Sequence, residues 1–402
     1  MSFDSLGLSA ELLRSIKDQG YTKATSIQEK AIPAALQGKD LMASAQTGTG
    51  KTAAFTLPML QKIAAQADGG RRHIKALVLA PTRELAAQVE DSVRTYGRHL
   101  KLRSLSVCGG AGIGPQIRQM NSGVDILVAT PGRLMDHMER GTVDLSGVET
   151  LILDEADRML DMGFFPAIEK IVKTLPKSRQ TLLFSATFSA PIQKLARNFM
   201  NSPELIETAA RNSAGEQIDQ SAYMVDSNRK RELLTHLIGT ENWGQVLVFT
   251  RTKRGADQLA KQLEQDGIRS TAIHGDKSQG ARTKALKQFK QNSVRALIAT
   301  DVAARGIDID RLDYVVNYDM PDNPDDYVHR IGRTGRGGEQ GSAISLVSGH
   351  EKGQFASIRK VVKKEIPSST VQGFEPQQRP RQGPRPGNGN GNRQGGRRSF
   401  QR

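Results

Sequence analysis

The stretch LILDEAD, residues 151–157, runs from three large aliphatic side chains directly into a cluster of carboxylates. The pattern predicts a buried strand whose end carries Asp154, Glu155 and Asp157. Carboxylates this close repel one another, and each loses hydration beside a buried strand. Two explanations stay open at this point: a solvated acidic turn, or a site for a cation that the sequence itself does not contain.

The alternation of apolar runs and amphipathic stretches continues along the chain. Continuous apolar strands separated by helices predict a mostly parallel sheet covered by helices on both faces, an α/β fold. In such sheets, ligands bind at the carboxyl ends of the strands, where this sequence has small or polar residues. The predicted strands are 40–45, 76–82, 125–131, 150–156 and 181–187 in the first half, and 245–250, 270–276, 295–301, 313–321 and 341–348 in the second.

Two α/β domains in tandem, joined by a short linker, are the predicted organisation; the alternative is one large domain with a surface loop. From Pro367 onward the composition changes to seven Arg, seven Gly and five Pro without Lys. Such a segment cannot bury enough apolar surface to fold. The predicted boundaries are 1–205 for domain 1, 206–217 for the linker, 218–366 for domain 2 and 367–402 for a disordered tail.

The chain of 402 residues has 57 Lys and Arg against 42 Asp and Glu, a net charge of +15. This excess favours a polyanionic partner, nucleic acid before membrane; simple solubility is the alternative. Cys108 is the only cysteine, which excludes a disulfide within the chain and a cysteine-based zinc site and favours a reducing cytoplasm. The first residues do not resemble a signal peptide, and no apolar run approaches the ~18 residues of a membrane span.

AQTGTGKT, residues 45–52, follows a predicted strand and nearly matches the phosphate-binding P-loop G-x-x-x-x-G-K-[ST], with alanine at the first glycine position. Gly48 and Gly50 let successive N–H groups turn toward phosphate oxygens. Lys51 would reach the β- and γ-phosphates, and Thr52 would ligate Mg²⁺. The alternative is a glycine-rich turn with a chance lysine. The motif predicts a nucleoside triphosphate as ligand.

The P-loop motif accounts for the cation that the carboxylates of LILDEAD require, because P-loop enzymes bind Mg²⁺. Such enzymes hold Mg²⁺ near an acidic residue at the end of a second strand, and Asp154 is the predicted partner, directly or through water. Glu155 is then placed to orient or deprotonate the attacking water as a general base. Asp157 is predicted to pair with a nearby basic or hydroxyl group.

YVHRIGRTGR, residues 327–336, concentrates arginines in the second half. His329, Arg333 and Arg336 fall at i, i+4 and i+7 and share one face if the segment is helical, while Arg330 points off that face. Since charge develops on the γ-phosphate oxygens during hydrolysis, we interpret this face as completing the nucleotide site from across an interdomain cleft. The alternative is binding of a phosphodiester backbone.

Together these motifs resemble those of the DEAD-box RNA helicases, in the family's order and over about residues 1–350. The opening MSFDSLGLSAELL and the short basic tail are most similar to the bacterial RhlE-type subgroup. The motifs are AQTGTGKT (45–52), PTRELA (81–86), TPGR (130–133), DEAD (154–157), SAT (185–187), ATDVAARGID (299–308) and HRIGRTGR (329–336).

The resemblance implies two RecA-like domains, ATP as the nucleotide and RNA as the activator. Within GYTKATSIQ (20–28), it implies that Gln28 recognises adenine, with Tyr21 and Phe3 as the matching aromatics; Ala24 stands where the family usually has proline. The nucleotide-binding residues it implies are Phe3, Tyr21, Gln28, Ala45, Gln46, Thr47, Gly48, Thr49, Gly50, Lys51, Thr52, Gly306 and Asp308.

The resemblance also implies the remaining roles, among them Arg333 and Arg336 as arginine fingers. Hydroxyls, glycines and arginines at strand ends suit phosphate and ribose oxygens rather than base edges, so little sequence preference is expected. The implied sets are Lys51, Asp154, Glu155, Arg333 and Arg336 for catalysis; Ser185, Thr187, His329 and Asp157 for coupling; and Pro81, Thr82, Arg83, Gly110, Thr130, Arg133, Arg251, Gly275, Thr300 and Asp301 for RNA.

Three functions stay open on this basis. The first is an ATP-dependent RNA helicase that unwinds short duplexes, and the second is an ATP-gated RNA clamp or chaperone whose unwinding is incidental. The third is a DNA-directed helicase or translocase; one zinc-bearing DNA class is removed by the missing cysteine cluster. The expected partners are structured RNA and, as candidates among proteins, the ribosomal or RNA-degradation machinery.

Overall fold

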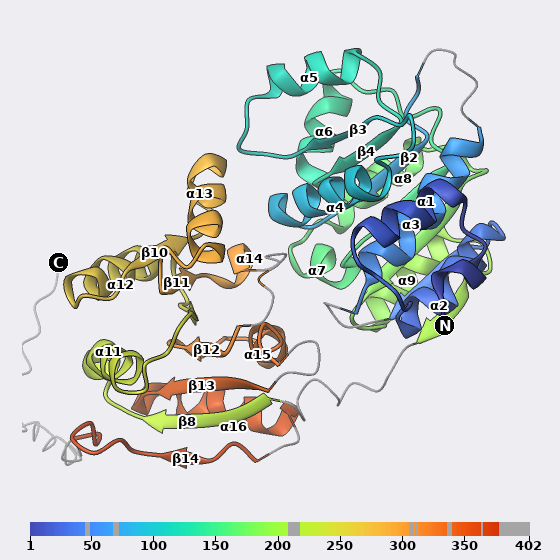
Figure 1. Ribbon diagram of the computed structural model, residues 1–402. Helices are drawn as coiled ribbons and strands as arrows, with labels where there is room; N and C mark the ends of the chain where they lie inside the picture. The colour runs from blue at the N-terminus through green and yellow to red at the C-terminus, as the bar shows by residue number, and fades with distance from the viewer. Residues whose placement is uncertain are drawn as a thin grey trace, which may run out of the picture.

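The computed structural model describes residues 1–44, 49–66, 72–207, 218–304, 309, 312–335, 340–362 and 365–377. These residues form two lobes, one drawn in blue to green and the other in yellow to red (Figure 1). Each lobe contains a parallel sheet between layers of helices, which confirms the predicted α/β fold with two tandem domains. Within the described ranges, no helix is both long and apolar enough to span a bilayer.

The first sheet has its most apolar strands at the centre. In spatial order, its described strands are β3 (Ser104–Val107), β4 (Ile126–Ala129), β2 (Ala76–Leu79), β5 (Thr150–Leu153), β6 (Gln180–Ser185), β1 (Leu41–Ser44) and β7 (Glu204–Glu207). Every residue of β2, β4 and β5 is buried. Val78 belongs to one hydrophobic core, and Leu77 and Leu79 belong to the other, so this sheet separates two helical layers.

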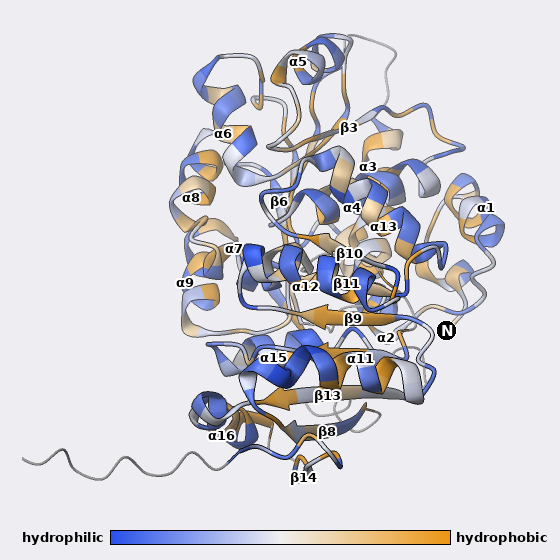
Figure 2. Ribbon diagram, turned by 90° about the vertical axis from the view of Figure 1, so that its left-hand side faces the viewer, coloured by the Kyte–Doolittle hydropathy of each residue, from blue (hydrophilic) through white to orange (hydrophobic). Residues whose placement is uncertain are grey.

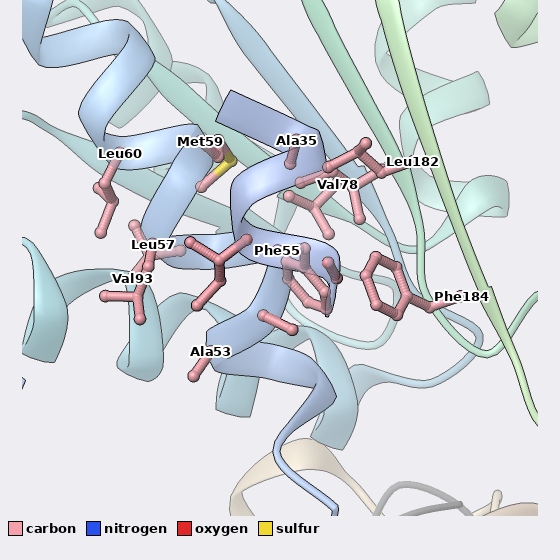
Figure 3. Packing of buried hydrophobic residues seen from close by; sticks show 14 of the residues in the cluster. Ala35, Ala53, Phe55, Leu57, Met59, Leu60, Val78, Val93, Leu182 and Phe184 are labelled. Carbon is pink, nitrogen blue, oxygen red and sulfur yellow. The ribbon is translucent and has the colours of Figure 1, made fainter. Parts of the chain in front are cut away.

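Helix α3 is fixed to the first sheet by aromatic packing. Phe55 of α3 meets Phe184 of β6 with ring centroids 5.2 Å apart, and Leu182 and Val78 lie beside them (Figure 3). This contact fixes the start of α3 relative to the end of β6. The described helices of the lobe are η1 (Phe3–Leu6), α1 (Ala10–Asp18), α2 (Ser26–Leu36), α3 (Lys51–Ala65), α4 (Arg83–Tyr96), α5 (Ile113–Asn121), α6 (Pro131–Glu139), α7 (Ala156–Asp161), α8 (Phe165–Thr174) and α9 (Ala190–Phe199).

The second lobe repeats this plan with hydrophobic strands under amphipathic helices, as β9 and α12 show (Figure 2). Its described strands, in spatial order, are β10 (Ser270–Ile273), β11 (Ala296–Ala299), β9 (Val246–Phe249), β12 (Tyr314–Asn317), β13 (Gly341–Val347), β8 (Ile218–Met224) and β14 (Ser368–Ser369). Its described helices are η2 (Ser227–Arg229), α11 (Lys230–Thr240), α12 (Lys253–Gln265), α13 (Gln279–Lys290), α14 (Asp301–Ala304), α15 (Pro324–Ile331), η3 (Gly349–Glu351) and α16 (Lys352–Val362).

All ten predicted strands are present, but four further strands, β3, β7, β8 and β14, were missed. These four lie at or next to the edges of the sheets. A strand at an edge is covered less completely, and β3, β7 and β8 bury only some of their residues. They therefore lack the continuous apolar run that marks the central strands.

The predicted domain boundaries need correction at two places. Strand β7 runs to Glu207, so the first domain does not end at 205 and the linker does not begin at 206. The predicted disordered tail does not begin at Pro367 either, because β14 pairs with β8 and the backbone C=O of Pro367 accepts a hydrogen bond from Ala222 at 2.9 Å. Beyond it, the Arg229 guanidinium lies 4.7 Å from the centre of the Phe374 ring. The described fold continues to residue 377.

This correction predicts that two truncations of the C-terminus will behave differently. Deleting residues 367–402 removes β14 and the Phe374 contact, which should lower the free energy of unfolding by about 2 kcal/mol. At about 2–4 °C per kcal/mol, the Tm should fall by roughly 4–8 °C. Deleting residues 378–402 leaves these contacts in place and should keep the Tm of the full chain. Thermal unfolding followed by circular dichroism compares the two, and equal Tm values would contradict a structural role for 367–377.

Candidate active site

The predicted phosphate-binding segment is described from Thr49 onward, so the predicted ligands at 45–48 (Ala45, Gln46, Thr47 and Gly48) lie outside the described residues. Lys51 is buried at the first position of α3, and Thr52 follows it half-buried. Gly50 has a left-handed backbone, φ +92°. Its C=O accepts a hydrogen bond from Nε2 of Gln28 at 3.1 Å, so a side chain at position 50 would collide with that amide. Both features require glycine directly before the lysine.

The acidic cluster lies at the carboxyl end of β5. The backbone N–H of Asp154 donates to the C=O of Leu79 at 3.0 Å, which extends the sheet by one residue. Glu155 then adopts a left-handed conformation, φ 50° and ψ 53°, and α7 begins immediately after it. Asp154 and Glu155 are both buried, with exposed fractions of only 2% and 4%. The alternative explanation, a solvated acidic turn, is therefore excluded.

The two buried carboxylates differ in their electrostatic environment. Burial raises the pKa of Asp154 to about 7, although the Lys51 ammonium opposes this shift. Burial acts in the same direction on Glu155, but Arg158, Lys51 and two basic side chains of the second lobe outweigh it and hold the pKa of Glu155 below its usual value. Glu155 Oε2 lies 3.4 Å from Arg158 Nε but has no hydrogen-bond partner among the described residues.

The two basic side chains of the second lobe that act on Glu155 are Arg333 and His329. The sequence placed His329 and Arg333 on one face only if the segment was helical throughout, and this condition is not met because α15 ends at Ile331. His329 lies on the helix and Arg333 in the turn that follows it. Arg333 is nevertheless only 3% exposed. The site thus receives positive charge from both lobes.

Arg330 points away from the predicted face, into its own lobe. Its guanidinium makes two hydrogen bonds to the carboxylate of Asp301, at 2.6 and 2.7 Å, and lies 5.1 Å from the centre of the Phe249 ring. Asp301, which was predicted to contact RNA, is therefore held inside the second lobe. The remaining residues assigned to this region lie outside the described ranges: Gly306, Asp308 and Arg336.

Asp157 joins the acidic loop to the SAT segment. Its carboxylate accepts hydrogen bonds from the backbone N–H groups of Arg158 at 3.0 Å and Ala186 at 3.1 Å. Backbone amides thus take the place of the predicted basic or hydroxyl partner. The Ser185 hydroxyl donates to the C=O of Thr187 at 2.8 Å. Three of the predicted coupling residues, Asp157, Ser185 and Thr187, therefore lie close together, because Asp157 bonds the residue between the other two.

The residues predicted to recognise adenine surround the N-terminus of α2. Phe3 is buried, whereas Tyr21 is 55% exposed. Gln28 Oε1 accepts a hydrogen bond from the N–H of Thr25 at 2.9 Å, while its amide nitrogen donates to Gly50. A carboxamide has two lone pairs and two N–H groups, so one of each stays available for a ligand. Recognition of adenine by Gln28 stays a prediction.

In the first lobe, the predicted RNA contacts follow the neighbouring strands β2, β3 and β4. Thr82, after buried Pro81, caps α4 by accepting a hydrogen bond from Leu85 at 3.2 Å. Gly110, after β3, has φ +79°, and the Arg83 guanidinium occupies the space that a Cβ at this position would need. After β4 come two more predicted contacts, Thr130 and Arg133.

The second lobe repeats this arrangement at β9, β10 and β11, which are followed by Arg251, Gly275 and Thr300. The Arg251 backbone N–H donates to Asp319 at 2.9 Å, and its guanidinium approaches Glu351 at 3.7 Å. The predicted RNA contacts thus leave equivalent strands of the two sheets. Because carboxyl ends of parallel strands share one edge of a sheet, each lobe presents its own contacts on one edge.

A direct contact between the lobes was missed from the sequence. Arg282 of α13 donates to Glu84 of α4 at 2.6 Å, and Gln279 also bonds Glu84, at 3.4 Å. Both charged residues are buried, at 4% and 5% exposure. Figure 1 shows α13 extending from the second lobe toward α4. The sequence offered one signal for this contact, the charge of Glu84 within PTRELA, close to a strand end. Nothing in the sequence pointed to Arg282, which lies 198 positions away.

Two RecA-like lobes, the first with a P-loop motif and a buried acidic strand end, are typical of the nucleic-acid-dependent P-loop nucleoside triphosphatases. The family model described as "DEAD/DEAH box helicase" matches residues 25–195, and the model described as "Helicase conserved C-terminal domain" matches residues 229–338. The chain belongs to the DEAD-box ATP-dependent RNA helicases and is an ATPase.

Bacterial relatives support this assignment over nearly the whole chain. The DEAD-box ATP-dependent RNA helicase CshA of Bacillus cereus is 44% identical over 382 residues, which cover 94% of this chain and 72% of the relative. The ATP-dependent RNA helicase CshA of Listeria monocytogenes is 45% identical over 364 residues, which cover 90% and 69%.

Solved structures of RNA-bound relatives are similar over most of this chain. S. cerevisiae Dbp5 bound to RNA and ADP BeF3 is 34% identical with a TM-score of 0.81, covering 92% of this chain and 95% of that one. Mss116p bound to ssRNA and AMP-PNP is 30% identical with a TM-score of 0.83, covering 92% of this chain and 80% of that one. A Dbp5 variant bound to nup159, gle1, IP6 and ADP is 31% identical with a TM-score of 0.61, covering 91% of this chain and 96% of that one.

The buried Glu84–Arg282 pair predicts a strong dependence of lobe closure on both partners. Truncating either one leaves the other charge buried and unpaired, so Glu84→Gln or Arg282→Met should weaken RNA binding in the presence of a non-hydrolysable ATP analogue by about 10- to 100-fold. The double variant should lose less than the sum of the two single variants. Fluorescence anisotropy with labelled RNA measures this effect.

Arg94→Met is the matched control for this measurement, because Arg94 is an exposed arginine on the same α4 helix. It should bind RNA like the parent chain. Fully additive losses in the double variant would show that Glu84 and Arg282 act separately, and they would contradict a pair that stabilises the closed arrangement.

Proposed function

We propose that this helicase hydrolyses ATP between its lobes with Glu155 as the general base. The observation that supports this role is the state of the Glu155 carboxylate. It is buried, cations of both lobes keep its pKa low, and Oε2 has no hydrogen-bond partner among the described residues. A general base must be ionised and must have an acceptor open to the attacking water. Lys51, at the positive end of α3, binds the β- and γ-phosphates.

The residues beside Glu155 fit a magnesium ion. Asp154 is a buried carboxylate whose pKa burial raises to about 7, and a divalent cation next to it would keep it ionised. Thr52 adds a hydroxyl oxygen in the first turn of α3. Mg²⁺ takes one or two protein oxygens together with water and phosphate oxygens. We propose that Asp154 and Thr52 hold Mg²⁺, partly through water, and that the ion neutralises charge on the phosphates.

In this proposal, the second lobe completes the catalytic site. Arg333 and Arg336 stabilise charge that develops on the γ-phosphate oxygens. His329 links the second lobe to the first. In the first lobe, Ser185, Thr187 and Asp157 couple ATP hydrolysis to strand separation. The proximity of Arg333 and His329 to Glu155 supports this assignment. Turnover then requires the lobes to be closed.

We further propose that one RNA strand lies across the carboxyl ends of β2, β3 and β4 and of β9, β10 and β11. The groups along this path are hydroxyls, glycines and arginines, which suit phosphate and ribose oxygens, so binding is largely independent of sequence. Discrimination against DNA requires contacts to the 2′-OH. When the lobes close around ATP, they bend this strand and locally unwind a short duplex.

A second candidate is an ATP-gated RNA clamp or chaperone with incidental unwinding, and the buried Glu84–Arg282 pair across the closed lobes favours it.

We also propose membership of the RhlE-type subgroup, supported by MSFDSLGLSAELL and the short basic tail. A cytoplasmic location is supported by the single cysteine, Cys108, and by the bacterial relatives. The proposed substrate is structured RNA, and the proposed protein partners are the ribosomal or RNA-degradation machinery.

The central test compares steady-state ATP turnover with RNA, with DNA and without nucleic acid, next to displacement of a short RNA duplex. We expect RNA alone to stimulate turnover and displacement to accompany it. Stimulation by RNA without displacement would favour the clamp. Equal stimulation by DNA would contradict recognition of the 2′-OH and favour a translocase that acts on either nucleic acid.

The proposed general base predicts a specific loss in Glu155→Gln. The amide cannot accept the proton of the attacking water, so turnover should fall about 100- to 10,000-fold. Binding of ATP and RNA should persist, because the shape of the side chain is retained. Single-turnover hydrolysis and equilibrium binding measure the two effects. Glu139→Gln, an exposed position at the end of α6, is the control and should behave like the parent chain; parental turnover in Glu155→Gln would eliminate the assignment.

A further inference from the structure

The glycine turn after β3, residues 109–112, lies against two arginines. Gly110 has a left-handed backbone, φ +79°, and the Arg83 guanidinium packs directly against it, in the space that a Cβ would occupy. On the next residue, the C=O of Ala111 accepts a hydrogen bond from Arg133 Nη1 at 3.0 Å. Arg133 was predicted to contact RNA, but this nitrogen is engaged within the protein. The shape of the turn therefore depends on where the Arg133 guanidinium is held.

Gln116 of α5 connects three segments of the chain at this point. Its Oε1 accepts hydrogen bonds from Arg133 Nη1 at 3.1 Å and from the His137 ring at 3.2 Å. Its Nε2 donates to the C=O of Cys108 at 3.1 Å. One carboxamide thus ties the end of β3 and the helix α6 to α5. Gln116 is only 8% exposed, so water cannot easily replace these bonds.

The hydrogen-bonding roles in this group follow from one another. Because Gln116 Nε2 donates to Cys108, Oε1 must be the atom that accepts from Arg133 and from His137 Nε2. His137 therefore carries a proton on Nε2, while Nδ1 lies 2.9 Å from the Thr142 hydroxyl, which also donates to the C=O of His137 at 3.1 Å. The ring is completely buried, and burial beside Arg133 lowers the pKa of His137, which keeps it neutral. The His137 ring is thus held between Gln116 and Thr142.

We propose that Gln116 is a positioning residue for RNA binding: it holds Arg133 against Ala111 and so keeps the glycine turn in the shape that receives the RNA backbone. The inference rests on the RNA path proposed above and assigns Arg133 an indirect role, through Ala111, rather than a phosphate contact by Nη1. A turn that is already ordered binds without a cost for ordering it. Loss of Gln116 therefore weakens RNA binding and leaves the chemistry of the distant acidic site in place.

The first experiment compares Gln116→Leu with Gln119→Leu, the same change at an exposed position of α5. In RNA-stimulated ATP turnover, Gln116→Leu should raise the KM for RNA about tenfold, the equivalent of one net hydrogen bond, while kcat changes less than about twofold. Gln119→Leu should match the parent chain. A parental KM for RNA in folded Gln116→Leu, or a fall in kcat with unchanged KM, would overturn the proposal.

The second experiment uses Cys108, the sole thiol of the chain, as a reporter of the turn. In the unmodified protein, single-stranded RNA with AMP-PNP should slow maleimide labelling of Cys108 at least threefold, and Gln116→Leu without RNA should label faster than Gln119→Leu. RNA that binds but leaves the labelling rate unchanged would overturn the inference even if Gln116→Leu failed to fold. If RNA neither binds nor stimulates turnover in the parent chain, the proposed RNA path itself fails.

Discussion

The structure depends on placing two adjacent carboxylates inside a protein. Asp154 and Glu155 lie at the end of a central strand, where burial acts to raise the pKa of each. For Glu155, the cations Arg158 and Lys51 of the first lobe and Arg333 and His329 of the second outweigh burial and hold the pKa below its usual value. For Asp154, Lys51 opposes burial only in part, and the pKa is raised to about 7. The low pKa of Glu155 therefore depends on cations from both lobes.

Two parallel sheets meet this requirement because their strands end on defined edges. In the first lobe, one edge carries the phosphate-binding helix, the acidic cluster and the SAT segment, and the Asp157–Ala186 hydrogen bond joins the last two. The second lobe also contacts the first through the buried pair of Glu84 and Arg282. The lobes thus interact at two places, one beside the carboxylates and one beside the turns that follow β2 and β3.

The sequence indicated the central elements well because burial on both faces leaves a continuous apolar run, as in β2 and β5. It was less informative wherever burial is partial or the partner is distant. Strand β7 buries mainly one residue, and β14 contributes only two, so neither carries a recognisable pattern. The motif residues Lys51, Asp154 and Glu155 could be found from local spacing, whereas the link between Glu84 and Arg282 spans 198 positions and no local rule reaches that far. The helical spacing of His329 and Arg333 was misleading because the glycine after Ile331 ends the helix before the arginine.

The left-handed backbone of Glu155 places a conformational cost on the residue proposed as the general base. Branched and charged side chains avoid this conformation, which costs roughly 1–2 kcal/mol outside glycine, while asparagine tolerates it better. Glycine or asparagine would therefore suit the backbone here better than glutamate does, but either would leave the buried Arg158 guanidinium without its carboxylate partner at 3.4 Å. Relief of backbone strain and loss of a buried ion pair thus act in opposite directions on folding at this position. Engineering of the chain for thermal stability has to keep glutamate at position 155 and look for gains elsewhere.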